Sequence, residues 1–467
     1  MTTQGTRTGG TRTGEVMTAI RRRAASGALA PGDRLPSIRG LATSMGVSPS
    51  TVVEAYDRLA AEGLIRARRG AGFYLVGTGA PPRPLGERGP ARDREVDPFW
   101  VSRQSLDADP ATLKPGCGWL PADWLPGEAF RRAIRALARA DDALMADYGP
   151  TRGALGLRRL LGARAAEEGL DVAPEQVLLT ASGTAAIDLV ARLLLRRGDT
   201  VLVDDPGYFN FQALLRAHDV RIVGVPWTPS GPDLAAFEAA VAAERPRLYL
   251  TNSALHNPTG GTMTAQTAHR LLVLAGAHDL TVVEDDIFAD LEPDRSPRLA
   301  VLDGLERVIR IGSFSKTLSA SVRCGYVVAR PEVIEGLVDL QVATAFGGPS
   351  PVATELIGAV LGGGGYRKHL DELYRRLAAA RREMTDRLAP LGLRPWIAPR
   401  GGFFLWCRLP DGLDSAAVAR AALADGVVLA PGAVFSVSHT ASPFLRFNVA
   451  QSLDPRVIPA LRRAMAG

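Results

Sequence analysis

Seven short apolar runs, separated by helical patterns, constrain the fold of this chain more than any other feature. Each run is rich in β-branched and aliphatic residues and ends in small or polar ones; the runs lie at 177–182, 200–207, 221–227, 247–252, 281–286, 308–316 and 324–330. Uninterrupted apolar strands that alternate with helices form mostly parallel sheets covered on both faces, so we expect an α/β domain. Ligands bind such sheets at the carboxyl ends of the strands, where the polar residues of these runs are concentrated.

A segment rich in proline, glycine and charged residues precedes this region. Residues 79–98 have no apolar periodicity, which is typical of a linker. The length of 467 residues agrees with two or three domains. We therefore predict a multidomain chain, with a flexible basic tail at 1–14, a small domain at 15–78, a linker at 79–112 and a large domain at 113–467.

The sequence argues against several classes of protein. It contains no run of about 18 apolar residues, so we expect no membrane span, and its first residues lack the apolar segment of a secretory signal. Cys117, Cys324 and Cys407 are scattered without the spacing of metal ligands. We therefore expect a reduced, cytoplasmic protein with neither a disulfide framework nor a metal site.

The net charge of +6 is confined to the first 78 residues. That segment has 11 arginines and five acidic residues, whereas the rest of the chain has 44 basic and 44 acidic residues. A small basic domain joined to a neutral large one favours a polyanionic partner for the small domain. On charge alone, a basic surface that merely keeps the protein in solution is an equal alternative.

The small domain shows the pattern of three helices followed by a hairpin. Helices are expected at 15–26, 38–45 and 50–63. Ser48 and Pro49 suit the N-cap and the first position of the third helix. Residues 64–77 alternate around Gly-Ala-Gly, which predicts a β-hairpin with a basic tip. The apolar face of the third helix comprises Val52, Ala55, Tyr56 and Leu59. This order of elements is that of a winged helix-turn-helix.

The small domain closely resembles the GntR-type winged-helix family, above all over LPSIRGLATSMGVSPSTVVEAYDRLAAEGLI at 35–65. The resemblance implies that the third helix enters the major groove of double-stranded DNA and that the wing follows the minor groove. The implied DNA contacts are Arg34, Ser37, Arg39, Ser48, Ser50, Thr51, Arg66 and Arg69. Pro49 stands where the family often has a basic residue, which removes one contact. A winged helix that contacts only protein is the alternative.

Groups of three kinds stand at strand ends in the large domain. Lys316 follows one strand, Asp285 closes another, and Ser182-Gly183-Thr184 lies between a strand and a helix. Each has an ordinary explanation by itself: a solvated lysine, a helix-capping carboxylate and a structural turn. Together they match the needs of pyridoxal phosphate, which binds a lysine, an acid facing its pyridine nitrogen and a phosphate cup at a helix N-terminus. Arg323 could pair with that phosphate.

The chain from about residue 113 to residue 467 resembles the fold-type I aminotransferases, with the family's motifs in the same order. The resemblance implies an α/β pyridoxal-phosphate-dependent transferase fold with a large and a small subdomain; PRGGFFLW at 399–406 matches the small one. By position, Lys316 would form the internal aldimine and Asp285 would face the pyridine nitrogen. Asn257, in NPTG, would bind the ring hydroxyl.

The same resemblance assigns the remaining site residues. Tyr208, in DDPGY, would stack on the pyridine ring, and Tyr148, in YGPTRGALGLR, would reach the phosphate of the neighbouring subunit's cofactor. Arg446, in LRFNVA, falls where the family binds a substrate carboxylate. The phosphate site would comprise Ser182, Gly183, Thr184, Ser313, Ser315 and Arg323.

One position departs from the family pattern. Phe288 stands where many aminotransferases have a tyrosine that bonds to the ring hydroxyl, and phenylalanine cannot make that bond. This change could tune the cofactor or weaken turnover. Trp100, Trp119 and Trp124 could line a pocket, although such residues more often belong to a core or an interface.

A GntR-type winged helix joined to an aminotransferase-like domain resembles the MocR family of regulators. The resemblance implies a homodimer, pyridoxal 5'-phosphate as cofactor, a double-stranded DNA operator as partner, and an amino compound or the cofactor itself as signal. We therefore predict a DNA-binding transcription regulator and not an enzyme. A working aminotransferase with an accessory DNA-binding domain is the second hypothesis, and repeated turnover with an amino donor and a keto acid would favour it.

Overall fold

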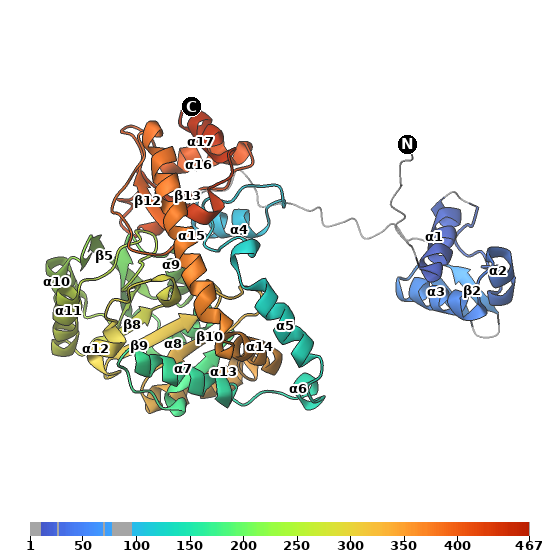
Figure 1. Cartoon of the computed structure of the whole chain (residues 1–467), viewed down its shortest axis with the longest axis horizontal. Coiled ribbons are helices and arrows are strands. Elements are labelled where there is room, and N and C mark those ends of the chain that lie inside the picture. Colours follow the sequence, from blue (N-terminus) through green and yellow to red (C-terminus); the bar gives the residue numbers. More distant parts are fainter. Residues whose placement is uncertain (1–10, 26–27, 69–70, 77–95, 467) are drawn as a thin grey trace. The chain divides into compact units, whose positions relative to one another are not determined.

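The structure is a computed structural model that describes residues 11–25, 28–68, 71–76 and 96–466. The chain forms two compact units, which separate between residues 89 and 90 (Figure 1). No helix among the described residues has the length and apolar character that a membrane crossing requires.

The first unit is a winged helix-turn-helix, as predicted. Its two strands form an antiparallel hairpin in which Ile65 pairs with Leu75. The predicted apolar face of the third helix is fully buried. The elements of this unit are α1 (Arg12–Ala25), α2 (Ile38–Met45), α3 (Pro49–Ala61), β1 (Ile65–Arg68) and β2 (Gly72–Leu75).

Short polar side chains fix the helix starts in this unit. Ser48 Oγ accepts a hydrogen bond from Thr51 N, and Pro49 occupies the first helical position, as predicted. The predicted tail at 1–14 is wrong at its end, because α1 already begins at Arg12. Thr11 Oγ1 accepts from Gly14 N, and the buried Thr13 donates to Glu54 of α3. Residues 1–10 lie outside the described part of the chain.

The second unit contains an eight-stranded sheet in the order β3-β10-β9-β8-β7-β4-β5-β6. The pairs β9-β8, β8-β7, β7-β4 and β4-β5 are parallel, and β10 is antiparallel to both of its neighbours. The seven predicted strands are therefore all present. The strands are β3 (Val177–Thr180), β4 (Thr200–Asp205), β5 (Arg221–Thr228), β6 (Gly231–Pro232), β7 (Leu248–Thr251), β8 (Thr281–Asp285), β9 (Val308–Ser313) and β10 (Gly325–Val328).

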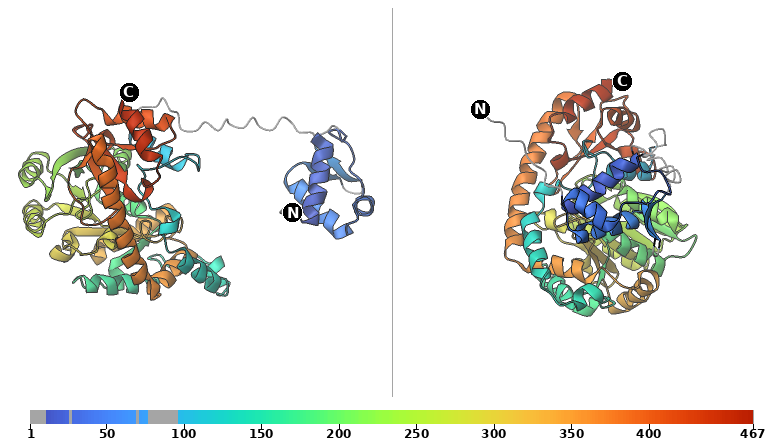
Figure 2. Two further views of the ribbon diagram at one scale, coloured as in Figure 1. Left: turned by 45° about the horizontal axis from the view of Figure 1, so that its top comes forward. Right: turned by 90° about the vertical axis from the view of Figure 1, so that its right-hand side faces the viewer.

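Helices cover both faces of this sheet, which explains why its strands are apolar throughout (Figures 1 and 2). One face packs on α8 (Gly183–Leu194), α9 (Phe209–Ala217) and α13 (Pro331–Ala345). The other face packs on α7 (Leu155–Glu167), α10 (Leu234–Glu244), α11 (Ala265–Ala277) and α12 (Leu299–Asp303). The remaining helices of this subdomain are α5 (Gly127–Leu137), α6 (Ala143–Ala146) and α14 (Pro351–Gly362).

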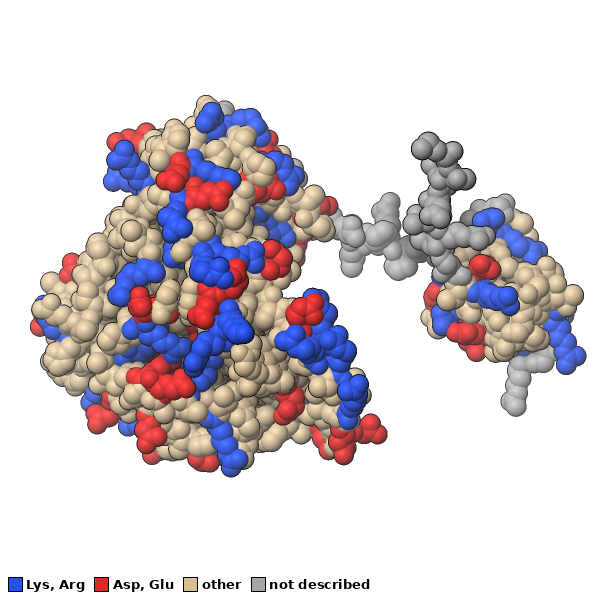
Figure 3. All heavy atoms as spheres, viewed as in Figure 1, with Lys and Arg blue, Asp and Glu red and all other residues tan. Residues whose placement is uncertain are grey.

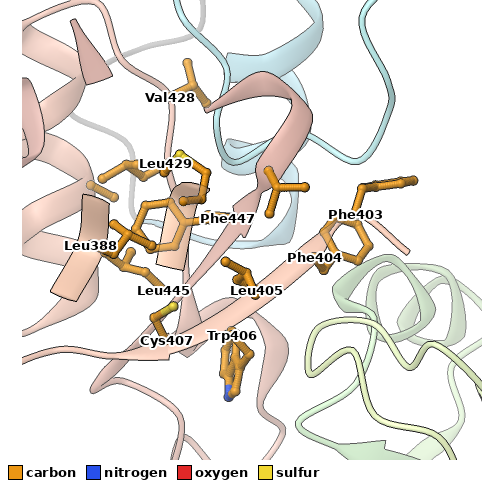
Figure 4. Close-up of a cluster of buried hydrophobic side chains, with 14 of the residues drawn as sticks. Leu388, Phe403, Phe404, Leu405, Trp406, Cys407, Val428, Leu429, Leu445 and Phe447 are labelled. Carbon is orange, nitrogen blue, oxygen red and sulfur yellow. The ribbon is translucent and has the colours of Figure 1, made fainter. Parts of the chain in front are cut away.

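A second, antiparallel sheet in the order β11-β12-β14-β13 forms the smaller subdomain. Its core alternates large aromatic and aliphatic side chains along β12, including Phe404, Trp406 and, from the neighbouring strand, Phe447 (Figure 4). The elements are β11 (Arg394–Pro395), β12 (Phe404–Arg408), β13 (Ala430–Pro431), β14 (Phe444–Asn448), α15 (Gly365–Leu388), α16 (Ser415–Ala424) and α17 (Val457–Ala466).

The predicted linker at 79–112 is too long. Residues 98–106 form helix α4 (Pro98–Leu106), which Asp97 caps by accepting a hydrogen bond from Trp100 N. Trp100 is 1% exposed and belongs to the same hydrophobic core as the small sheet. The proline-rich composition of the preceding residues hid this helix, because the apolar pattern of α4 spans little more than two turns. Residues 77–95 lie outside the described part.

Candidate functional site

The predicted cofactor residues converge at the carboxyl edge of the large sheet. Asp285 is the last residue of β8, and Lys316 lies three residues after β9. Gly183 opens α8 shortly after β3, and Tyr208 immediately precedes α9 after β4. The parallel arrangement of these strands brings the groups to one edge of the sheet.

Lys316 lies partly buried at this edge. Its ammonium donates a hydrogen bond to the carbonyl oxygen of Gly118 over 2.7 Å. Removal from water and, second, the positive charge of Arg446 lower the pKa of Lys316 to about 8, while the charge of Asp285 opposes the shift. A lysine with this pKa is partly neutral near physiological pH, as a nucleophilic amine must be.

Asp285 is a buried carboxyl group in this site. It is 2% exposed, and its nearest backbone donor, Ile287 N, lies 3.4 Å from Oδ1. Burial raises the pKa of Asp285 to about 7. A cation placed against this carboxylate would restore its ionised form, so the position suits the protonated nitrogen of a pyridine ring.

The N-terminus of α8 packs tightly against the neighbouring strand ends. A Cβ atom built on Gly183 would lie 3.6 Å from Ser313 Cβ, and one built on Gly325 would lie 2.7 Å from Gly183 N. Only glycine therefore allows β10 to approach this helix end. Ser313 Oγ lies 3.0 Å from Ser315 Oγ. The helix N-terminus beside two hydroxyl groups is a suitable cradle for a phosphate.

The other predicted phosphate residues differ in their surroundings. Ser182 Oγ accepts a hydrogen bond from Ala185 N, so this side chain caps α8. Thr184 is exposed at the first turn of α8. Arg323 adopts a left-handed backbone conformation with φ 55°, and its charge contributes to the lowered pKa of Lys316. Arg323 therefore lies near Lys316, as the phosphate assignment requires.

Arg446 is a buried cation on the small subdomain. It is 2% exposed and donates to Asn257 Oδ1 over 2.7 Å and to the carbonyl oxygen of Gly116 over 2.6 Å. Its guanidinium lies over the rings of Phe404 and Phe435. Burial lowers the pKa of Arg446 to about 10, so the group stays charged at neutral pH. Its Nε has no hydrogen-bond partner within the described part of the chain.

Two further predicted residues have contrasting positions. The half-buried Tyr208 lies close enough to Arg446 and Asp285 to interact electrostatically with both, and burial raises the pKa of its hydroxyl. Tyr148 is 81% exposed and packs edge-on against Phe346. Within one chain the structure does not bring Tyr148 to Lys316; the assignment to a neighbouring subunit's site stays a prediction.

Phe288, where the sequence departs from the family pattern, packs in a hydrophobic core. Its ring is 3% exposed and packs edge-on against Phe403 and Phe404. The side chain offers no hydroxyl to the site. Trp100 and Trp124 also belong to this core, whereas Trp119 is partly exposed.

Sequence reasoning missed the segment at 113–119, which we call the strap. Its Gly116 and Gly118 carbonyl oxygens accept from Arg446 and Lys316. Asn448 Nδ2 in turn donates to the carbonyl oxygens of Cys117 and Trp119. The strap binds through backbone carbonyl oxygens, which every residue has, so it has no recognisable side-chain motif. The two glycines in PGCG at 115–118 are the sequence signal that could have found it.

The predicted DNA contacts lie at the surface of the first unit. Ser48 Oγ lies 2.8 Å from both Ser50 Oγ and Thr51 Oγ1, so three hydroxyls meet at the start of α3. The Arg34 side chain lies over Gly72 in the wing. Arg69 lies outside the described residues. Ser37, which caps α2, and Arg39 and Arg66 are exposed.

Charge distribution distinguishes the two units. The larger unit shows basic and acidic side chains interspersed over its visible face (Figure 3), which agrees with its balanced composition.

Arg68 was not among the predicted contacts; it is exposed and lies 4.5 Å from the centroid of the Tyr74 ring on the other strand of the wing.

The comparisons with known proteins agree with this geometry. The model of the family described as aminotransferase class I and II matches residues 121–463. The chain belongs to this family. The model described as bacterial regulatory proteins of the gntR family matches residues 12–75. The two matches together give the MocR-type architecture.

The relatives of this chain include a named enzyme and named transcriptional regulators. The chain is 33% identical to a 2-aminoadipate transaminase of Thermus thermophilus over 365 residues, covering 75% of this chain and 90% of the relative. It is 30% identical to the uncharacterized HTH-type transcriptional regulator YdcR of Escherichia coli over 459 residues, covering 95% and 96% of the two chains. Relatives along nearly the whole chain are thus named as regulators, and one along the large domain as an enzyme.

A solved structure supports the fold. The crystal structure of LysN, an alpha-aminoadipate aminotransferase of Thermus thermophilus complexed with N-(5'-phosphopyridoxyl)-L-leucine, matches with a TM-score of 0.71 and 30% identity. The match covers 79% of this chain and 94% of LysN. The family and this fold indicate pyridoxal phosphate as the cofactor. The residues present fit it, since a lysine of lowered pKa, a buried acid and a glycine-lined helix N-terminus share one edge of the sheet.

The lowered pKa of Lys316 predicts how cofactor uptake depends on pH. Because only the neutral amine attacks a carbonyl, the initial rate should rise about tenfold per pH unit below the pKa and level off above about pH 8. Mixing the cofactor-free protein with pyridoxal phosphate between pH 6 and 10 and following visible absorbance measures this rate. A rate that still rises steeply above pH 9 would mean that Lys316 has the pKa of an ordinary lysine.

Proposed function

We propose that the chain is a pyridoxal-phosphate-dependent transcription regulator, in which occupancy of the Lys316 site changes how the winged helix binds DNA. The observation that carries the proposal is the union, in one chain, of a gntR-family winged helix and an aminotransferase class I and II domain in which Lys316 and Asp285 share one sheet edge. The signal is a small amino compound or the cofactor itself, and the partner is a double-stranded DNA operator.

The site residues have distinct tasks in this proposal. Pyridoxal phosphate, when bound, supplies a carbonyl that accepts amines and an electron-withdrawing ring. Lys316 holds the cofactor and releases it to a competing amine, and Asp285 stabilises a positive charge on the ring nitrogen. The α8 N-terminus, Ser313 and Arg323 bind the phosphate.

Arg446 would recognise the carboxylate of an amino acid effector. A guanidinium matches a carboxylate with two parallel hydrogen bonds, and the aromatic rings around Arg446 exclude water from the pair. Arg446 Nε has no hydrogen-bond partner among the described residues, so the guanidinium keeps a free N–H for the effector carboxylate beside its bonds to Asn257 and Gly116. The name of the Thermus relative makes L-2-aminoadipate the first amino compound to test.

We further propose a homodimer. Tyr148 and Phe346 form an exposed aromatic pair, 81% and 68% accessible, that a second subunit would cover. Tyr148 of one subunit would then contact the phosphate bound in the other.

A working aminotransferase is the second candidate function, favoured by the 33% identity to a transaminase. Phe288 favours the regulator, because it stands where the family resemblance implies a tyrosine hydroxyl and its ring packs on Phe403 instead. The two candidates differ in turnover: with an amino donor and a keto acid acceptor, an enzyme shows many cycles per site, whereas the regulator shows at most one conversion of its cofactor.

The DNA-binding surface predicts a salt-dependent affinity. Replacing Arg39 or Arg66 with alanine should weaken DNA binding at low salt, and each loss should reduce the slope of log K against log salt by about 0.9 if the arginine contacts a phosphate. Arg21, which pairs with Glu62 over 2.6 Å, provides the control, since Arg21→Ala should leave the slope unchanged. Fluorescence anisotropy with upstream DNA, over a salt range of about 50 to 200 mM, measures these slopes; equal slopes for all variants would refute the assignment.

A further inference from the structure

The strap links the two cations of the proposed effector site to each other. The Gly118 carbonyl oxygen accepts from Lys316 of the large subdomain, and the Gly116 carbonyl oxygen accepts from Arg446 of the small one. These donors are the groups that the cofactor carbonyl and an effector carboxylate require. A cofactor carbonyl that takes Lys316 therefore competes with the strap for the bond to Gly118, and a carboxylate bound to Arg446 lies beside the bond to Gly116.

The strap itself is attached to the small subdomain. Leu113 N donates to the carbonyl oxygen of Gly426 over 2.9 Å, and Gly116 N donates to that of Val428 over 2.8 Å. A Cβ atom at Gly116 would lie 2.4 Å from Ala430 N, so only glycine permits this contact. Asn448 of β14 adds two further hydrogen bonds from its side chain. A displacement of the small subdomain must carry the strap with it, whereas the bond from Lys316 to Gly118 holds the strap to the large subdomain.

Helix α4 contacts both sides of this boundary, the large subdomain through α9 and the small subdomain through its hydrophobic core. It precedes the strap by residues 107–112 and packs against α9, the helix that begins immediately after Tyr208. Trp100 and Val101 supply the buried apolar contacts of α4, at 1% and 2% exposure. Both side chains belong to the same core as the small sheet, so α4 lies between α9 and the small subdomain.

Helices α4 and α9 both contain buried polar groups without a hydrogen-bond partner among the described residues. Trp100 Nε1, Gln104 Nε2 and Ser105 Oγ on α4, and Gln212 Nε2 on α9, are buried without a hydrogen-bond partner in the described part of the chain. All four side chains are at most 5% exposed. Because a buried polar group without a partner loses its hydration and gains nothing in return, these groups lower the stability of the packing around α4 and α9.

We propose that α4 is a detachable helix that reports occupancy of the Lys316 and Arg446 site to the DNA-binding unit. Loss of the Lys316–Gly118 bond frees the strap to move with the small subdomain, and the short connection at 107–112 pulls α4 from α9. Release of α4 lengthens the connection between the winged helix and the large domain. This inference rests on the proposed function and names the element through which it acts.

Hydrogen–deuterium exchange of the full-length protein tests the release. Loading with pyridoxal phosphate should raise amide exchange in residues 98–106 about tenfold, and Lys316→Ala should raise it without cofactor because the variant lacks the donor to Gly118. Equal exchange in the cofactor-free, loaded and Lys316→Ala proteins would overturn the proposal. Exchange that falls on loading would do the same.

Two substitutions in α4 test whether a more stable α4 weakens the response of DNA binding to cofactor loading. Gln104→Met removes an unmet polar group at similar volume, so it should slow exchange in α4 and reduce the DNA response to loading about tenfold, with the visible absorbance of the bound cofactor unchanged. Arg103→Gln, at an exposed position of the same helix, is the matched control and should change neither. If Gln104→Met slows exchange but leaves the DNA response intact, α4 is not the transmitter.

These measurements separate the inference from the proposed function. If the cofactor and every amino compound leave the DNA affinity of the wild-type protein unchanged, the proposed function fails, regardless of the exchange measured in α4. If DNA binding responds while exchange in α4 stays constant, the proposed function stands and this inference is wrong.

Discussion

Lys316→Ala should abolish covalent attachment of pyridoxal phosphate and any effect of the cofactor or an amino compound on DNA binding. The chain has only three lysines, Lys114, Lys316 and Lys368, and Lys316 is the one beside Asp285 and Arg446. Because its pKa is lowered, the Lys316 amine is partly neutral near physiological pH. The arginines of the site stay charged and cannot supply such an amine. We expect the visible absorbance of the loaded protein to disappear and DNA affinity to become independent of cofactor concentration.

Lys368→Ala is the matched control for this loss. The Lys368 side chain is exposed on α15, so its removal should leave absorbance and DNA response unchanged. Borohydride treatment of the loaded protein, followed by peptide mass analysis, identifies the attachment site. A label on Lys368 or Lys114, or a Lys316→Ala protein that keeps its absorbance, would contradict the assigned role.

Arg446→Gln should weaken the response to carboxylated amines about 30-fold or more, while pyridoxal phosphate still binds. Truncating one member of a buried, hydrogen-bonded charge pair costs about 2–5 kcal/mol, and Arg446 lies 2% exposed among aromatic rings where water does not compensate. Glutamine is shorter and neutral, so it cannot donate both hydrogen bonds to a carboxylate.

The Arg446 prediction is measured by titrating the loaded protein with a panel of L-amino acids and following the cofactor absorbance. Arg408→Gln, an exposed arginine on the adjacent strand β12, should respond like the wild type. Amines without a carboxylate should be insensitive to Arg446→Gln. An Arg446→Gln protein with wild-type affinity for amino acids would show that the effector carboxylate binds elsewhere.

Much of this fold could be predicted from the sequence because its strongest signals are local. The strands of the large sheet are apolar on both faces, and Ser48 and Pro49 mark the start of α3 without any tertiary information. Lys316 and Asp285 could be placed in one site because both follow strands of one parallel sheet, whose carboxyl ends share an edge.

The parts that could not be predicted depend on long-range contacts. Helix α4 follows a proline-rich segment and is stabilised mainly by Trp100 and Val101 in a distant core. The strap acts through backbone carbonyls, which every residue has. The role that the resemblance assigns to Tyr148, at the cofactor of a second subunit, stays a prediction, because a single chain shows only that its side chain is 81% exposed.

The most direct test of the account is the affinity of the full-length protein for DNA immediately upstream of its own gene, measured with cofactor-free protein, with loaded protein and with loaded protein plus L-amino acids. We expect at least one of these occupancies to change the Kd for specific DNA by about tenfold or more, the size of a typical coupling between sites, with no change in Lys316→Ala. The same Kd for all three in the wild-type protein, together with repeated transamination, would show that the chain is an enzyme whose winged helix does not respond to its site.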